Sequence, residues 1–128
     1  MYQIDIMSRV PVYEQIVDQT VKFILTGILK SGDKIPSVRS LSVKLSVNPN
    51  TIQKSIAELD RRGLIFSVPG KGCFVSETAK DALTAVKRGE MTDIKNKIKE
   101  LLLAGVTKEE LIGLIEEVYS NKEVKSND

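Results

Sequence analysis

The pair Asn48-Pro49 constrains the fold of this chain more than any other local feature. Asn is among the preferred N-cap residues of helices, and Pro fits the first helical position because its missing N–H has no partner there. The pair therefore predicts a helix that starts at residue 48 or 49 and runs to about Arg62, where Gly63 stops it. Its buried face would be formed by Ile52, Ile56 and Leu59.

Two further helices are expected before this one. Residues 12–29 carry apolar side chains at three- and four-residue spacing, as one helix face requires: Val12, Ile16, Val17, Val21, Ile24, Leu25 and Ile28. Pro36 biases the residue before it away from helix, so the next helix begins after it, capped by Ser37. That helix is short because Ser46 and Val47 break its pattern, and its buried face would be Val38, Leu41 and Leu45.

After Gly63 the pattern changes to strand. Residues 64–68 and 73–76 read as two strands, and the sequence PGKG at residues 69–72 makes the turn of a hairpin. Two short helices joined by a tight turn and followed by a hairpin indicate a winged helix-turn-helix, which places one helix in the major groove of DNA. The expected fold is mainly α with a small β-hairpin, comprising a winged helix-turn-helix over residues 1–76 and an all-helical region over residues 77–128.

The remaining residues are predicted to be helical. Residues 79–86 form a helix that Gly89 bends or interrupts, an apolar stripe continues to Leu102, and Gly105 ends that segment. Thr107 and Glu110 have the spacing of a capping box and start the last helix, after which the tail beyond Ser120 is expected to fray.

About 50 residues cannot bury such apolar stripes alone, so we expect this region to pair with a second copy of the chain. The residues expected at this homodimer interface are Ile94, Ile98, Leu101, Leu111, Leu114, Ile115 and Val118. The alternative is that the helices fold back on their own winged domain.

Composition excludes several classes of protein. The chain has 128 residues, of which 41% are hydrophobic and 28% charged, which is typical of a globular protein. It has no apolar run of the roughly 20 residues that a membrane span needs and no signal peptide pattern, so we expect a cytoplasmic protein with no membrane partner. Because the chain contains no histidine, most catalytic and zinc sites are excluded, and we expect no enzyme, no metal and no cofactor.

Charge is distributed unevenly along the chain. Residues 1–76 carry ten Lys or Arg and six Asp or Glu, whereas residues 77–128 carry nine and eleven. A basic front half and a mildly acidic back half suit double-stranded DNA as the partner of the first region and protein as the partner of the second.

The candidate DNA contacts lie on three segments. The exposed start of the third helix offers Asn48, Asn50, Thr51, Gln53 and Lys54, of which Asn and Gln can make bidentate contacts to adenine. Arg39 on the second helix can reach a phosphate or a guanine edge. The hairpin tip offers Gly70, Lys71 and Gly72, where glycine allows the backbone to approach DNA closely.

These segments also resemble a known family. The sequence PSVRSLSVKLSVNPNTIQKSIAELDRRGLI, followed by GKGCFV, resembles the winged-helix region of the GntR-family bacterial transcription regulators over about residues 10–76. The motif NPNT at residues 48–51 and the short helical remainder are similar to the YtrA-like subfamily. Two positions depart from the family pattern, since Pro49 stands where many members have an arginine and Cys73 stands in place of a threonine.

The resemblance implies a homodimer that binds a palindromic operator and controls a neighbouring transporter operon, acting as a repressor rather than an activator. It also implies that Arg39, Asn48, Asn50, Thr51, Gln53 and residues 70–72 occupy DNA-contacting positions. Nothing in the residues names an effector. Two other hypotheses remain open: a winged-helix module that binds proteins and no DNA, and a metal- or redox-responsive regulator acting through Cys73.

Overall fold

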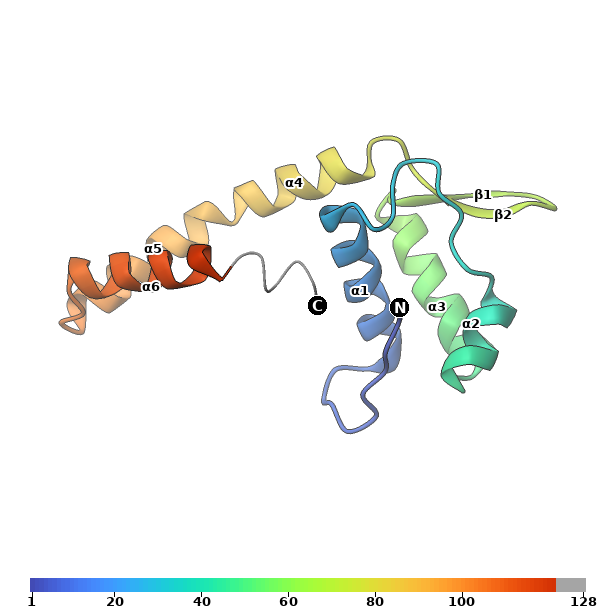
Figure 1. The fold of residues 1–128 in the computed structure, drawn as a ribbon, viewed down its shortest axis with the longest axis horizontal. Coiled ribbons are helices and arrows are strands. Elements are labelled where there is room, and N and C mark those ends of the chain that lie inside the picture. The colour runs from blue at the N-terminus through green and yellow to red at the C-terminus, as the bar shows by residue number, and fades with distance from the viewer. Residues whose placement is uncertain (122–128) are drawn as a thin grey trace. The chain divides into compact units, whose positions relative to one another are not determined.

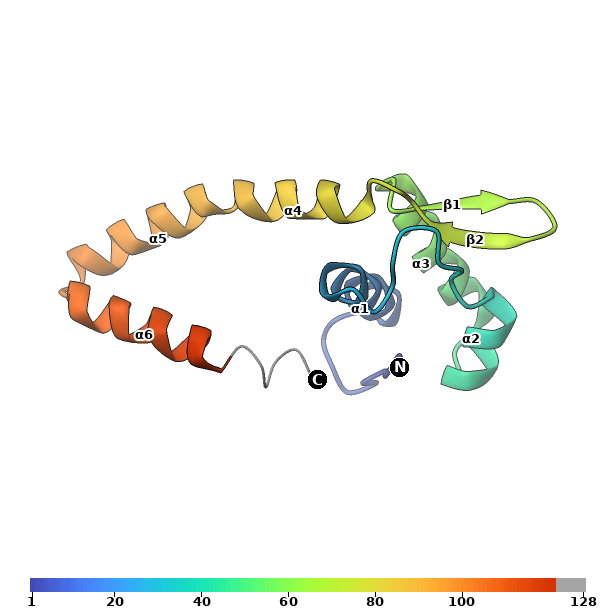
Figure 2. The same cartoon turned by 45° about the horizontal axis from the view of Figure 1, so that its top comes forward.

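The computed structural model describes residues 1–121, and the polar tail at residues 122–128, which was expected to fray, lies outside the described residues. The chain forms two compact units, Met1–Ala85 and a second that begins at Val86. The first holds the three predicted helices, the hairpin and most of a fourth helix, and the second holds the end of that helix and a pair of further helices (Figures 1 and 2). The predicted fold class, mainly α with one small hairpin, is confirmed.

Helix α1 (Val12–Thr26) ends earlier than its apolar pattern predicted. Gly27 adopts the left-handed conformation (φ 84°) and its N–H bonds to the carbonyl of Ile24, which closes the helix. Placing Ile28 on the buried helical face was therefore wrong, since it follows the turn and is 46% exposed. Leu29 is buried after the turn, where its N–H bonds to the carbonyl of Phe23 at 3.0 Å.

Helices α2 (Val38–Leu45) and α3 (Pro49–Arg61) form the helix-turn-helix, and their caps are those predicted. The Ser37 hydroxyl accepts the N–H of Ser40 at 3.0 Å, and Asn48 Oδ1 accepts the N–H of Asn50 at 2.8 Å. Ser46 ends α2 in the left-handed conformation (φ 54°), so only three residues separate the two helices.

The wing consists of β1 (Ile65–Val68) and β2 (Gly72–Val75), paired antiparallel with Ile65 opposite Val75. A third segment pairs with the other edge of β2. The N–H of Ile35 bonds to the carbonyl of Cys73, and the N–H of Val75 bonds to the carbonyl of Asp33, both at 2.8 Å. Residues 33–35 therefore form part of the wing.

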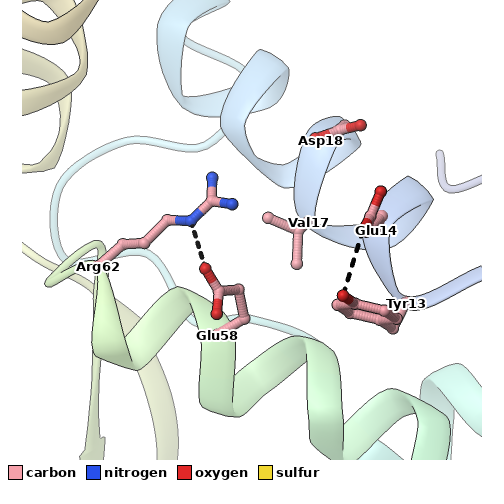
Figure 3. Close-up of a pocket in the computed structure, with 6 residues that line it drawn as sticks. All are labelled: Tyr13, Glu14, Val17, Asp18, Glu58 and Arg62. Atoms are coloured by element: carbon pink, nitrogen blue, oxygen red, sulfur yellow. Dashed lines mark hydrogen bonds and ion pairs between the residues drawn. The ribbon is translucent and has the colours of Figure 1, made fainter. Parts of the chain in front are cut away.

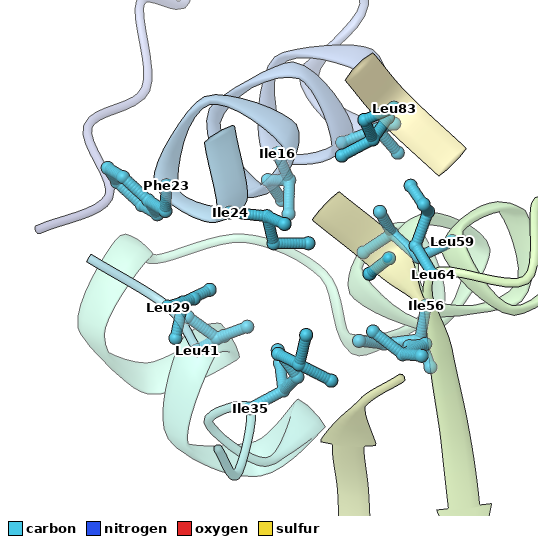
Figure 4. Packing of buried hydrophobic residues seen from close by; sticks show 14 of the residues in the cluster. Ile16, Phe23, Ile24, Leu29, Ile35, Leu41, Ile56, Leu59, Leu64 and Leu83 are labelled. Atoms are coloured by element: carbon cyan, nitrogen blue, oxygen red, sulfur yellow. The ribbon is translucent and has the colours of Figure 1, made fainter. Parts of the chain in front are cut away.

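The core of the first unit is built from side chains of all these elements (Figure 4). The buried residues predicted on α3, namely Ile52, Ile56 and Leu59, are confirmed, as are Ile16, Val17 and Ile24 on α1. Phe23 and Thr20 are also buried on α1, although their positions were not predicted. Several hydrogen bonds fix the N-terminal segment on α1; among them, Tyr2 Oη lies 2.7 Å from Thr20 Oγ1, and Gln15 Oε1 accepts the N–H of Asp5.

Helix α4 (Ala79–Gly89) belongs to this core through Ala79 and Leu83, which are both buried. The first compact unit consequently extends to Ala85, nine residues beyond the expected end of the DNA-binding domain at residue 76. The interruption expected at Gly89 is present, since α4 ends there and α5 (Met91–Leu103) follows.

Helix α6 (Lys108–Ser120) follows a turn at Gly105. The predicted capping box is confirmed, because Thr107 Oγ1 accepts the N–H of Glu110 and Glu110 Oε2 accepts the N–H of Thr107, both at 3.2 Å. Neither α5 nor α6 contains a buried residue. Among the described helices, none combines the length and the apolar character needed to cross a bilayer.

Candidate nucleic-acid interface

Helix α3 is anchored to α1 by apolar burial and one side-chain bond. Ile52 and Leu59 are 0% exposed, and the buried Ser55 Oγ donates to the carbonyl of Tyr13 at 3.1 Å. Because these residues fix the rotation of α3, Asn50 and Gln53 are held on its exposed face and Thr51 is half-buried beside them. The predicted reading face is therefore brought together on one side of a firmly packed helix.

Asn48 and Lys54 are already engaged in the absence of DNA. The Oδ1 atom of Asn48 caps α3, so only its amide N–H groups remain to bind another molecule. Lys54 Nζ lies 4.0 Å from the centre of the Tyr13 ring, a cation–π contact between α3 and α1. Asn48 thus has the capping role that its sequence position predicted, whereas the contact of Lys54 with Tyr13 was not predicted.

Arg39 lies exposed in the first turn of α2. No hydrogen bond or ion pair within residues 1–121 engages its guanidinium group. Arg39 is therefore available for a bidentate contact to phosphate or to guanine.

The tip of the wing is a tight turn with an exposed lysine. The N–H of Lys71 bonds to the carbonyl of Val68 at 2.9 Å, and Gly70 between them has φ 77°. A Pro at the second position and a Gly with positive φ at the third are the features of a type II turn. This geometry presents Lys71 to solvent beyond the last paired residues, Val68 and Gly72.

The opposite end of α3 has a different electrostatic character. A cleft of about 290 Å³ lies between α1 and α3, lined by Tyr13, Glu14, Val17, Asp18, Glu58 and Arg62 (Figure 3). Arg61 and Arg62 donate to Glu58 at 2.9 and 2.7 Å, and these bonds lower the pKa of Glu58 to about 2. The two arginines are therefore paired within their own helix, and the three carboxylates would repel phosphate. The amide- and hydroxyl-bearing start of α3, rather than its charged end, is the part suited to DNA.

Replacing Glu58 by Gln is expected to change how folding stability depends on pH. The pKa of Glu58 in the folded state lies below its ordinary value of 4.5, so its contribution is complete above about pH 4.5 and is lost as the pH falls toward 2. The difference in unfolding free energy between wild type and Glu58→Gln should shrink over that interval. Denaturant unfolding from about pH 6 to about pH 2 measures it, and a difference that stays constant would contradict the ion-pair assignment.

Cys73 lies half-buried on the inner face of the wing, where its Sγ is 3.3 Å from Ser67 Oγ. It packs against the core beneath the hairpin. In the part of the chain that the structure describes, no three His, Cys, Asp or Glu side chains gather as metal ligands.

Two residues near this surface were missed by the sequence analysis. Tyr13 contacts α3 through its carbonyl and its ring, and Lys34 lies beside the wing because its segment pairs with β2. Both contacts join residues about 40 positions apart, and no local pattern in the sequence signals them.

Comparisons with known proteins agree with this geometry. Residues 12–75 match the model of the GntR family of bacterial regulatory proteins. The chain is 44% identical to the transcriptional repressor YtrA of Bacillus subtilis, over an alignment of 133 positions that covers all of both chains. It also superposes with a TM-score of 0.72 on a GntR-family transcriptional regulator from Listeria monocytogenes, which is 36% identical, covering 90% of this chain and 99% of that one.

A third comparison includes DNA. The DNA-binding domain of AraR, solved in complex with an operator, is 30% identical and superposes with a TM-score of 0.51, covering 59% of this chain and 93% of that one. The relatives are regulators of transcription and not enzymes, as the absence of histidine led us to expect. The chain therefore belongs to the GntR family of bacterial regulatory proteins and is a winged-helix, DNA-binding regulator of transcription.

Proposed function

We propose that this protein is a homodimeric repressor that binds a palindromic operator through the start of α3. The observation that carries the proposal is the set of exposed polar side chains held on a capped and firmly packed helix. Such a helix can enter the major groove without changing its own structure.

In this proposal the operator sequence is read by four side chains. Asn50 and Gln53 can each make a bidentate contact to adenine, Thr51 can bond a base or a phosphate, and Arg39 can bond guanine. The first turn of α3 also directs unbonded N–H groups toward the phosphate backbone. Asn48 caps the helix and can donate its amide N–H groups to the DNA. Lys54 can also bind phosphate, but its ammonium group must then divide its interactions between the phosphate and the Tyr13 ring or move away from the ring.

The wing supplies contacts that carry no sequence information. Lys71 is exposed at its tip, and the flanking Gly70 and Gly72 have no side chains to keep the backbone away from DNA. This part of the interface would set affinity and register, whereas α3 and Arg39 would set specificity.

Dimerisation is assigned to residues 77–128, and DNA binding to residues 1–76. Helices α5 and α6 expose apolar side chains that a folded monomer would not leave in water, including Ile94 (54%), Ile98 (39%), Leu114 (55%), Ile115 (53%) and Val118 (43%). Leu101 and Leu111 are half-buried at the same helices. A two-fold dimer through these faces would present two copies of α3 to half-sites about one helical turn apart.

Repression is the proposed direction of control, and a relative supports it. A full-length relative at 44% identity is named a repressor, and a dimer clamped on an operator near a promoter would block transcription. We propose that the protein acts in the cytoplasm and that its operon encodes a transporter, which rests on the resemblance to YtrA-like regulators.

A gel-shift experiment with the DNA upstream of the protein's own gene tests this function. We expect a retarded complex at protein concentrations at least about a thousandfold lower than for a scrambled duplex of equal length. This factor is the lower end of the ratio between specific and non-specific affinity in DNA-binding regulators. Binding to neither duplex would overturn the proposal and favour the protein-interaction module. If the wild type and Cys73→Thr respond identically to a change from reducing to oxidising buffer, Cys73 has no redox role.

A further inference from the structure

The side chain of Lys34 lies on the outer face of the wing. Lys34 pairs with Phe74 in an antiparallel bridge, so the two side chains point to the same side of the sheet, together with the position of Gly72. Ile35, the next residue, points to the other side and is buried in the core (2% exposed). The backbone pairing therefore fixes the direction in which Lys34 leaves the sheet.

Gly72 provides the space that the Lys34 side chain occupies. A Cβ atom at Gly72 would lie 3.0 Å from Cε of Lys34 and 3.7 Å from its Nζ, and Gly72 has φ 116°. The lysine stem thus crosses Gly72 instead of extending away from the sheet. Because Gly72 is two residues, or about 7 Å, closer to the wing tip than Phe74, the ammonium group is directed along β2 toward Lys71.

The ammonium group of Lys34 is not neutralised by nearby carboxylates. Residues 65–75 contain no Asp or Glu, and the carboxylate of the adjacent Asp33 accepts the N–H of Lys30 at 2.8 Å. None of the ion pairs in the described part of the chain includes Lys34, in contrast to the paired Arg61 and Arg62. Lys34 and Lys71 therefore place two positive charges along one edge of the wing.

We propose that Lys34 is a second phosphate-binding residue of the wing, and that Gly72 is the positioning residue that keeps its stem along β2. The inference rests on the proposed function, because it requires the wing to lie against the DNA backbone. The occupant is a phosphate group, so the contact would act on every duplex regardless of sequence.

The test measures operator binding by fluorescence anisotropy over a series of salt concentrations. The proteins are the wild type, Lys34→Met, which keeps an apolar stem without the charge, and Lys34→Arg, which restores the charge. Each phosphate contact contributes about 0.9 to the slope of log K against log [salt], so Lys34→Met should reduce the slope by about 1.8 per dimer. Lys34→Arg should keep the wild-type slope, and Lys71→Met should lower it as Lys34→Met does.

Lys22→Met is the matched control, because it removes one positive charge from an exposed position of α1, an element outside the wing. Its slope should equal that of the wild type. If Lys34→Met keeps the wild-type slope while Lys71→Met has a reduced slope, the inference fails and the proposed function stands. If the wild type itself shows no binding to either the upstream or a scrambled duplex, the proposed function fails as well. A reduced slope in Lys22→Met equal to that of Lys34→Met would show an effect of net charge alone and would also overturn the inference.

Discussion

Replacing Arg39 and Gln53 together by alanine should reduce affinity for the operator by at least about a thousandfold in the dimer. A good bidentate base contact is worth about 1–3 kcal/mol, so two lost contacts cost each subunit about 2–6 kcal/mol. Both side chains are exposed, and no hydrogen bond or ion pair in the described part of the chain depends on them. The loss should therefore come from the complex and not from the free protein. Anisotropy at fixed salt measures it.

The single variant Gln53→Ala separates base reading from general attraction to DNA. Gln carries no charge, so its removal should weaken binding to the operator and leave binding to a scrambled duplex unchanged. Thermal unfolding of both variants should match that of the wild type. Unchanged operator affinity in the double variant, or an equal loss on both duplexes in Gln53→Ala, would contradict the reading role of α3.

The substitution Ile94→Asp should convert the dimer to a monomer. Because a monomer binds only one half-site, operator affinity should fall by several orders of magnitude. Ile94 is 54% exposed in the single chain, so the variant should fold, but pairing would bury two unpaired carboxylates. Sedimentation velocity reports the mass of each protein, and anisotropy reports its affinity. A variant that remains dimeric would place the interface elsewhere.

Leu103→Asp is the control for this experiment. Leu103 is 89% exposed on the same helix α5, nine residues after Ile94 and therefore half a turn around the helix from it. The same substitution there should leave the dimer and its operator affinity intact. Dissociation by both substitutions would show that charge anywhere on α5, and not the predicted face, is responsible.

Local signals in the sequence predicted the starts of several helices correctly. Asn48 and Pro49 placed the start of α3, and Thr107 with Glu110 placed the start of α6, because caps depend on residues only a few positions apart. The end of α1 was misplaced because Ile28 and Leu29 continue the apolar pattern beyond Gly27. Leu29 is buried in the core, but it belongs to the segment that follows the helix and not to the helix.

The features that could not be predicted depend on contacts between distant residues. The bridge from Lys34 to Phe74 and the contact from Lys54 to Tyr13 each join segments about 40 residues apart. The first unit extends to Ala85 because Ala79 and Leu83 pack against the core. Core residues that are distant in the sequence form this contact, so no local pattern predicts it. The exposure of Asn50 and Gln53 could be predicted because it follows from helical periodicity, whereas the contact of Lys54 with the Tyr13 ring does not.

A hydroxyl-radical footprint of the DNA upstream of the protein's own gene tests the central claim most directly. Two copies of α3 related by a two-fold axis should protect two half-sites with inverted sequence, whose centres lie about 10 base pairs apart or a multiple of that spacing. Protection should disappear with the Arg39→Ala, Gln53→Ala double variant at the same protein concentration. A single protected site without inverted symmetry, or protection that the double variant retains, would contradict a dimer that reads DNA through the start of α3.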